Sequence, residues 1–150
     1  DACAPYGVYD DMKAKCDAYF VNHHRDGEMR GIGGLFFDDL HSGGPAQDAV
    51  MVKALSEAFM PSYFPIVERR KGLEWNDQDE AFQLFRRGRY VEFNLLHDRG
   101  TKFGLQTKGR VPSILISLPA RCHFSYTYEP AVGSPHERMA GHYWPRDWLA

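Results

Sequence analysis

The chain has 150 residues, of which 43% are hydrophobic and 25% are charged, and its formal net charge is −2. These values exclude a disordered chain and a strongly basic nucleic-acid-binding protein, and no apolar run is long enough to cross a bilayer. The three cysteines, Cys3, Cys16 and Cys122, form no Cys-x-x-Cys pair. They therefore support neither a zinc ribbon nor a dithiol redox site.

Helical spacing of apolar residues is found mainly before residue 88. It predicts helices over residues 10–24, 46–60, 63–70 and 76–88. Pro61 and Pro65 are expected to interrupt the second of these helices, because proline lacks the backbone N–H group that a helix interior needs. Asp10 is expected to cap the first helix, and Asn76 or the next residue to begin the last, with Glu80 as its capping-box partner.

Alternation of apolar and polar residues predicts strands in the remainder of the chain. The expected strands cover residues 35–40, 90–97, 102–107, 114–118 and 123–129. In the second of them, Val91, Phe93 and Leu95 would share one face. Short connections favour antiparallel pairing. The expected fold class is therefore α+β, with an antiparallel sheet and helices packed against it.

Basic residues concentrate between Arg86 and Arg110. This stretch contains seven basic and two acidic residues, so its local charge is +5 in a chain whose total is −2. Two interpretations remain open. The excess of positive charge predicts a site that receives an anion, or it reflects solvated strand ends.

Two long motifs carry a family resemblance. Residues 86–105 read Arg-Arg-Gly-Arg-Tyr-Val-Glu-Phe-Asn-Leu-Leu-His-Asp-Arg-Gly-Thr-Lys-Phe-Gly-Leu, and residues 30–40 read Arg-Gly-Ile-Gly-Gly-Leu-Phe-Phe-Asp-Asp-Leu. The chain resembles the C-terminal half of the oxygen-dependent coproporphyrinogen III oxidases of haem biosynthesis. The resemblance implies a broad antiparallel sheet between helices, to which residues 1–150 contribute the C-terminal part of a single domain. We expect an absent N-terminal half, which in the family holds the proton-donor His.

The resemblance also implies a reaction. Two propionates of coproporphyrinogen III would be oxidatively decarboxylated to vinyl groups, with O2 as co-substrate, giving protoporphyrinogen IX, CO2 and H2O2. No organic cofactor is required. A divalent metal is possible, but the spacing of the histidines does not support a metal site.

Asp98 and Arg99 match the centre of the longer motif. From the residues alone, Asp98 could simply belong to a hairpin turn, or it could be a carboxylate held ionised by the neighbouring cations. The resemblance implies a catalytic Asp98 that faces the pyrrole nitrogens, with Arg99 holding it or contacting the substrate.

Further basic residues match substrate-binding positions of the family. Lys108, Gly109 and Arg110 align with a Gly-Gly-Arg segment, in which Lys108 replaces the first Gly. Arg30 is a second candidate for binding a propionate, because the planar guanidinium binds a carboxylate through two hydrogen bonds. A solvated turn is the alternative interpretation of residues 108–110.

The His-Arg pair of the family falls on His24 and Arg25, which makes His24 a catalytic candidate. A single His in a loop is more often a surface or capping residue, and the adjacent His23 competes for the family position. The resemblance implies a homodimer whose contacts come from the stretch between residues 90 and 124: Tyr90, Val91, Phe93, Leu95, Phe103, Ile114, Ile116 and Phe124.

We expect a cytoplasmic protein, with the mitochondrion as the alternative, and no nucleic-acid partner. The competing functions are a module that binds a tetrapyrrole or another polyacid without converting it, and a purely structural dimerisation domain. The presence of Asp98 argues against the binding module.

Overall fold

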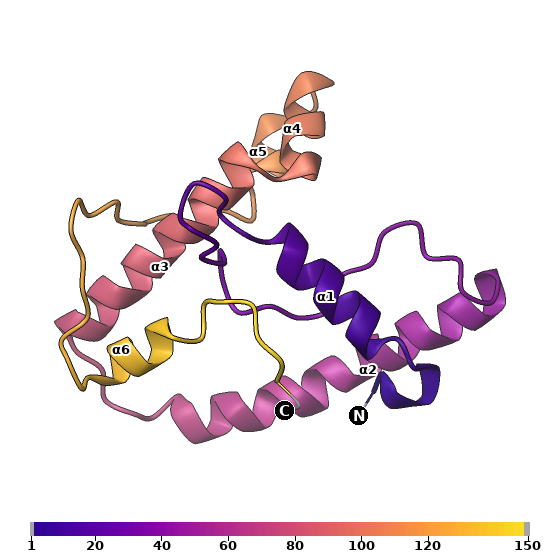
Figure 1. The fold of residues 1–150 in the computed structure, drawn as a ribbon, viewed down its shortest axis with the longest axis horizontal. Helices are drawn as coiled ribbons and strands as arrows, with labels where there is room; N and C mark the ends of the chain where they lie inside the picture. The colour runs from indigo at the N-terminus through magenta and orange to yellow at the C-terminus, as the bar shows by residue number, and fades with distance from the viewer. Residues whose placement is uncertain (1, 149–150) are drawn as a thin grey trace. The chain divides into compact units, whose positions relative to one another are not determined.

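The computed structural model describes residues 2–148, which fall into two compact units. The first unit contains the described residues up to Cys16 together with Gly34–Trp75, and the second contains Asp17–Gly33 and the described residues from Asn76 onward. Figure 1 shows the helices and the long connecting segments from which each unit is built. None of the helices in this described part of the chain is long and apolar enough to cross a membrane.

The predicted α+β fold is wrong. Residues 2–148 contain helices but no strand, and the only pairing of β type among them is an isolated antiparallel bridge between Val21 and Met29. Residues 90–97, 102–107 and 114–118, which were expected to be strands, lie largely in helices or turns. Residues 35–40 and 123–129 are irregular.

The reason is clearest in α3 (Asp77–Leu96), which continues through the predicted end at Gly88. Phe82, Phe85, Arg89 and Phe93 are buried at spacings of three and four, so the helical period extends across the stretch that also alternates. A helix satisfies its backbone hydrogen bonds internally, whereas a strand needs a neighbouring strand. The alternation of apolar and polar residues between positions 90 and 97 was therefore not enough to distinguish a strand from a helix.

The start of α3 was predicted correctly, apart from one partner. Asn76 is the N-cap, and its side chain accepts hydrogen bonds from the backbone N–H groups of Gln78 and Asp79. Asp79, rather than Glu80, completes the capping box by accepting from the N–H of Asn76 at 2.9 Å. An Asp at the third helical position can serve where Glu was expected, because both present a carboxylate to the same free amide.

The first unit contains η1 (Ala4–Tyr6), α2 (Pro45–Arg70) and most of α1 (Tyr9–Tyr19). Asp10 lies inside the first turn of α1 and does not cap it, because the helix begins one residue earlier. Pro61 and Pro65 lie inside a continuous α2, so the predicted interruption is also wrong. Because the two prolines are four residues apart, they lie on one side of the helix. Any bend that each produces in the helix axis therefore has the same direction.

The second unit is organised around α3. It also contains α4 (Arg99–Gln106), α5 (Val111–Ile114) and α6 (Pro135–Ala140). The segment of residues 20–30, here called the His-Arg loop, is closed by hydrogen bonds of 2.9 Å from Asn22 N–H to the Glu28 carbonyl and 3.1 Å from Arg30 N–H to the Phe20 carbonyl. The side-chain amide of Asn22, which is fully buried, donates to the Arg89 carbonyl at 3.2 Å and so attaches this loop to α3.

Candidate functional site

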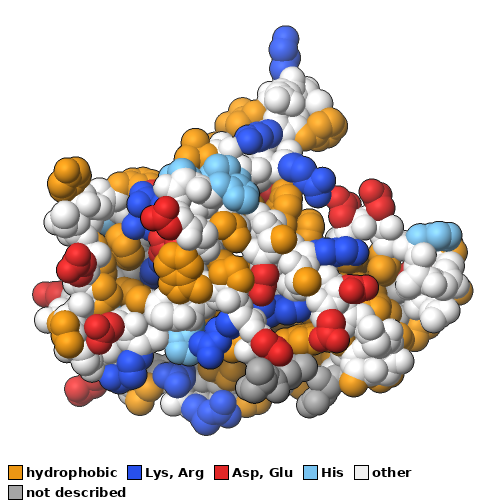
Figure 2. Space-filling view, in the orientation of Figure 1, with side chains coloured by type: hydrophobic (Ala, Val, Ile, Leu, Met, Phe, Trp, Pro, Cys, Tyr) orange, Lys and Arg blue, Asp and Glu red, His pale blue; other side chains and the backbone are white. Residues whose placement is uncertain are grey.

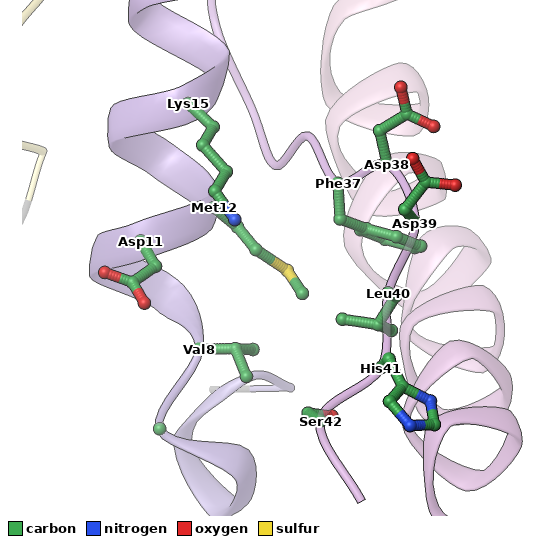
Figure 3. Close-up of a pocket in the computed structure, with 11 residues that line it drawn as sticks. Val8, Asp11, Met12, Lys15, Phe37, Asp38, Asp39, Leu40, His41 and Ser42 are labelled. Carbon is green, nitrogen blue, oxygen red and sulfur yellow. The ribbon is translucent and has the colours of Figure 1, made fainter. Parts of the chain in front are cut away.

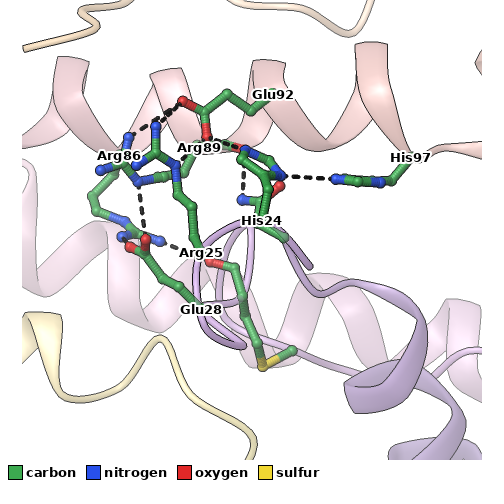
Figure 4. A network of polar contacts seen from close by, with 9 residues as sticks. His24, Arg25, Glu28, Arg86, Arg89, Glu92 and His97 are labelled. Carbon is green, nitrogen blue, oxygen red and sulfur yellow. Dashed lines mark hydrogen bonds and ion pairs between the residues drawn. The ribbon is translucent and has the colours of Figure 1, made fainter.

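The His-Arg loop contacts α3 through charged side chains (Figure 4). Glu28 forms ion pairs with Arg86 and with Arg89, whose Nε lies 2.9 Å from Oε2 of Glu28. Arg86 also donates to the Met29 carbonyl at 2.9 Å, and its guanidinium lies 3.6 Å from the ring centroid of Tyr143. Arg86 and Arg89 are buried and paired within the protein. Their charges therefore hold the loop on α3 and do not contribute to an open anion site.

A second carboxylate, that of Glu92 in α3, binds the same loop at Arg25. Arg25 donates from Nε and Nη2 to the two oxygens of Glu92, both at 2.5 Å. Burial raises the pKa of Glu92, but the hydrogen bond and charge of Arg25, with the charge of Arg89, outweigh burial and leave this pKa lowered. The same hydrogen bond raises the pKa of Arg25. Glu92 is therefore an ionised, acceptor-only group at neutral pH.

His24 lies beside this ion pair. Its Nδ1 is 2.9 Å from Nε2 of His97, and its Nε2 is 3.3 Å from Oε2 of Glu92. The neighbouring His23 packs edge-on against His97, with 5.4 Å between the ring centroids. The structure thus places His24 and His23 at the same point of α3, but only His24 is hydrogen-bonded to Glu92.

The side chain of Arg30, at the end of the loop, lies against three aromatic rings. Its guanidinium carbon lies 4.1 Å from the ring centroid of Phe20, 4.8 Å from that of Tyr90 and 5.3 Å from that of Phe93. Among the residues that the structure describes, no carboxylate forms an ion pair with Arg30. Stacking on rings restrains the guanidinium while leaving its N–H edge able to bind a carboxylate.

Asp98 lies at the junction of α3 and α4. Its Oδ2 accepts from the N–H of Thr101 at 2.6 Å, and so it caps α4. Its Oδ1 accepts from the Tyr19 hydroxyl at 3.3 Å, while that hydroxyl accepts from the N–H of Arg99 at 3.0 Å. A carboxylate has about four acceptor positions, so this one keeps capacity for further donors.

One aromatic cluster connects these candidates. The rings of Tyr19, Phe20 and Phe93 lie between 4.8 and 5.7 Å apart, measured between centroids. Arg30 stacks on this cluster, Asp98 bonds to the Tyr19 hydroxyl, and the Arg99 guanidinium lies 5.0 Å from the Tyr19 ring centroid. Three predicted site residues, Arg30, Asp98 and Arg99, therefore meet at this cluster near the C-terminal end of α3. His24 is linked to it through His97, whose ring centroid lies 6.1 Å from that of Phe93.

The remaining predicted substrate-binding residues form the turn between α4 and α5. Lys108 N–H donates to the Leu105 carbonyl at 3.1 Å and Gly109 N–H to the Gly104 carbonyl at 2.9 Å, which is a Schellman motif that ends α4. Arg110 is exposed and donates to the Ser113 hydroxyl at 3.1 Å. None of the described contacts joins this turn to His24, Arg30 or Asp98.

A model of the coproporphyrinogen III oxidase family matches residues 1–148. The chain belongs to the coproporphyrinogen III oxidase family. The resemblance to the coproporphyrinogen III oxidase family, read from the two motifs, is thereby confirmed, and membership of this family gives the chain a role in haem biosynthesis.

Within this family member, the expected dimer residues differ in exposure. Val91 and Phe93 are buried within their own unit, Tyr90 and Ile114 are half-buried, and the other four are exposed: Leu95, Phe103, Ile116 and Phe124. Hydrophobic side chains over α4 and α5 are visible at the surface in Figure 2, beside basic ones. Their role in dimerisation stays a prediction.

The first unit contains a separate hollow of about 250 Å³ between α1 and residues 37–42 (Figure 3). Met12, Phe37 and Leu40 supply apolar surface, and Asp11 and Asp38 supply carboxylates. None of the predicted site residues lines it. Among residues 2–148, no group of three or more His, Cys, Asp or Glu side chains is arranged to hold a metal ion.

Sequence reasoning missed four residues of the site: Tyr19, Glu28, Glu92 and His97. Glu28 and Glu92 carried a usable signal, because they are acids beside an Arg-rich motif and a buried Arg needs a partner. His97 and Tyr19 gave no such signal. Their partners lie 73 and 79 residues away in the chain and were identified only by the packing of the loop on α3.

Proposed function

We propose that this protein is an oxygen-dependent coproporphyrinogen III oxidase. The observation that carries the proposal is the convergence of Arg30, Asp98 and Arg99 on one aromatic cluster, to which His24 is linked through His97, in a chain that the family model matches over residues 1–148. Two propionates of coproporphyrinogen III are converted to vinyl groups at this cluster, and protoporphyrinogen IX is released. We expect the intact enzyme to be a cytoplasmic homodimer.

The charge of each residue determines which part of the substrate it contacts. The tetrapyrrole presents pyrrole N–H donors and anionic propionates, so it needs an acceptor and cations at separate points. Asp98 accepts from pyrrole N–H groups or removes a pyrrole proton, because its carboxylate has acceptor capacity beyond Tyr19 and Thr101. Arg30 and Arg99 bind propionates, and Arg110 contacts a third propionate from the α4–α5 turn.

Each decarboxylation is balanced without a redox cofactor. The propionate loses CO2 and one C–H hydrogen, and the two electrons released reduce O2. The hydrogen and one proton from solution complete H2O2. The net reaction of each propionate therefore consumes one O2 and one proton and gives one vinyl group, one CO2 and one H2O2.

The test is turnover of coproporphyrinogen III by the full-length protein, followed by fluorescence of the oxidised product, with and without O2 and after chelator treatment. We expect turnover that requires O2 and survives chelation. Arg30→Lys should raise KM about tenfold, since lysine cannot stack and bind a carboxylate through a planar fork. Arg87→Lys, at an exposed position of α3, is the matched control.

A binding module is the second candidate, because four site residues suit binding as well as catalysis. It predicts tight binding of the tetrapyrrole with no product in the presence of O2. That result with the full-length protein would contradict the oxidase.

A further inference from the structure

His24 is held by α3 at both nitrogens of its ring (Figure 4). His97 lies 2.9 Å from Nδ1, and the carboxylate of Glu92 lies 3.3 Å from Nε2. These two partners are five positions apart on the same helix and its C-cap. The orientation of the His24 ring is therefore determined by α3 although the residue itself belongs to a loop.

Glu92 determines which nitrogen of His24 carries the proton. Because Arg25 keeps Glu92 ionised, its carboxylate can only accept a hydrogen bond. Neutral His24 must therefore present Nε2–H to Glu92, which leaves a lone pair on Nδ1. His97 then donates its own Nε2–H to that lone pair.

A single added proton can be shared along this chain of groups. A charged His24 donates Nδ1–H to the lone pair on Nε2 of a neutral His97, so the 2.9 Å contact survives. If both rings are charged, two N–H groups face each other and the contact is lost. Burial lowers the pKa of His97, and the charges of His24, His23 and Lys102 lower it further, which favours the state with one added proton.

Each propionate in the proposed reaction consumes one proton, so the reaction has a use for such a route. We propose that His97 and Glu92 are positioning residues for His24: Glu92 fixes the Nε2–H tautomer, and His97 passes a proton from solvent to Nδ1 as the Nε2–H proton of His24 leaves for the H2O2 that forms. The proton delivery rests on the proposed function. The tautomer and the coupling of the two rings are properties of the fold and can be tested without turnover.

The first test is ¹⁵N NMR of the full-length protein with labelled histidines. We expect the Nε2–H tautomer at His24, and a mixture of tautomers in Glu92→Gln. The pKa of His97 should rise in His24→Gln, because burial remains while one neighbouring positive charge is removed. An Nδ1–H tautomer in the wild type, or a His97 pKa that does not change in His24→Gln, would overturn the positioning of His24.

The second test compares His97→Gln with His97→Ala in turnover. Glutamine keeps a donor for Nδ1 but cannot release a proton, so both variants should lose about tenfold or more in kcat with KM unchanged. Added imidazole should restore part of the rate of His97→Ala. His136→Gln is the matched control, since His136 is hydrogen-bonded to Asp79 at 2.8 Å and has no contact with His24.

The outcomes of this second test separate the two proposals. A full rate in His97→Gln would overturn proton delivery through His97. Absence of turnover in the wild type would overturn the proposed oxidase and proton delivery together, whereas the positioning of His24 would still be decided by its tautomer.

Discussion

Arg25 and Glu92 form a two-point ion pair, with both hydrogen bonds at 2.5 Å. This pair attaches the His-Arg loop to α3 beside His24. It also makes the stability of the second unit depend on pH, because the Glu92 carboxylate binds protons less readily in the folded protein than in the unfolded chain.

The direction of that dependence follows from the lowered pKa of Glu92. The stabilisation is fully present above the ordinary value of 4.5 and is lost as the pH falls through the lower pKa of the folded protein. Glu92→Gln should therefore reduce stability at pH 7 and flatten its loss below pH 4.5. Urea unfolding between pH 7 and pH 3 measures this. Glu80→Gln, at a more exposed pair with Arg121, should retain the wild-type profile; an identical profile in both variants would contradict the prediction.

Glu28 is predicted to matter more for stability than either Arg that it binds. Glu28→Gln leaves Arg86 and Arg89 buried without a carboxylate, and should cost about 3 kcal/mol in the free energy of unfolding. Arg86→Met should cost less, because Glu28 keeps Arg89 as its partner and no buried charge is left unpaired. Denaturant midpoints of the two variants give the order directly, and the reverse order would refute this account.

Replacement of Gly88 by alanine should destabilise the protein, whereas the same replacement of a typical helix glycine stabilises it. Alanine in a helix interior normally stabilises by about 1 kcal/mol. At Gly88, however, a Cβ atom would overlap the backbone carbonyl oxygen of His123. Gly88→Ala should therefore destabilise by about 2 kcal/mol. Gly104→Ala, whose Cβ would meet the movable side chain of Ile114 at 3.0 Å, should cost less in the same thermal unfolding measurement.

Lys108→Gly should stabilise the protein. Lys108 has a φ of 58°, a left-handed conformation that glycine adopts with little strain. The expected gain is about 1 kcal/mol, the cost of placing a non-glycine residue in this region. Lys102→Gly, in the interior of α4, should lose a similar amount. A loss of stability in Lys108→Gly would show that the Schellman turn at the end of α4 does not form.

Asp98→Asn is predicted to be a cleaner test of catalysis than Asp98→Ala. Alanine removes the cap of α4 and should cost about 1 kcal/mol in stability, in addition to any loss of turnover. Asparagine keeps the cap but removes the negative charge. We expect Asp98→Asn to retain its melting temperature and lose turnover at least a hundredfold. Near-normal turnover with an intact fold would exclude a catalytic role for Asp98.

Two motifs in the sequence alone were enough to identify the family, because strings of 20 and 11 residues carry specific information that does not depend on a correct fold. The N-cap at Asn76 was likewise predictable, since capping depends on residues within one helical turn. Local information was insufficient for residues 90–97. Their alternating and helical patterns coexist, and only the burial of Phe93 in continuation of Phe82, Phe85 and Arg89 decided for the helix.

The site divides in the same way. Arg30, Asp98 and His24 were predicted as candidates from motifs, whereas the contacts of Glu28, Glu92 and His97 came only from tertiary structure. Arg86 and Arg89 looked like part of an open basic cluster until Glu28, about 60 residues away, was seen to pair with both. The sequence alone gives the number of charged side chains. Whether an ion is buried with a partner or left to bind a ligand depends on chain segments that only folding brings into contact.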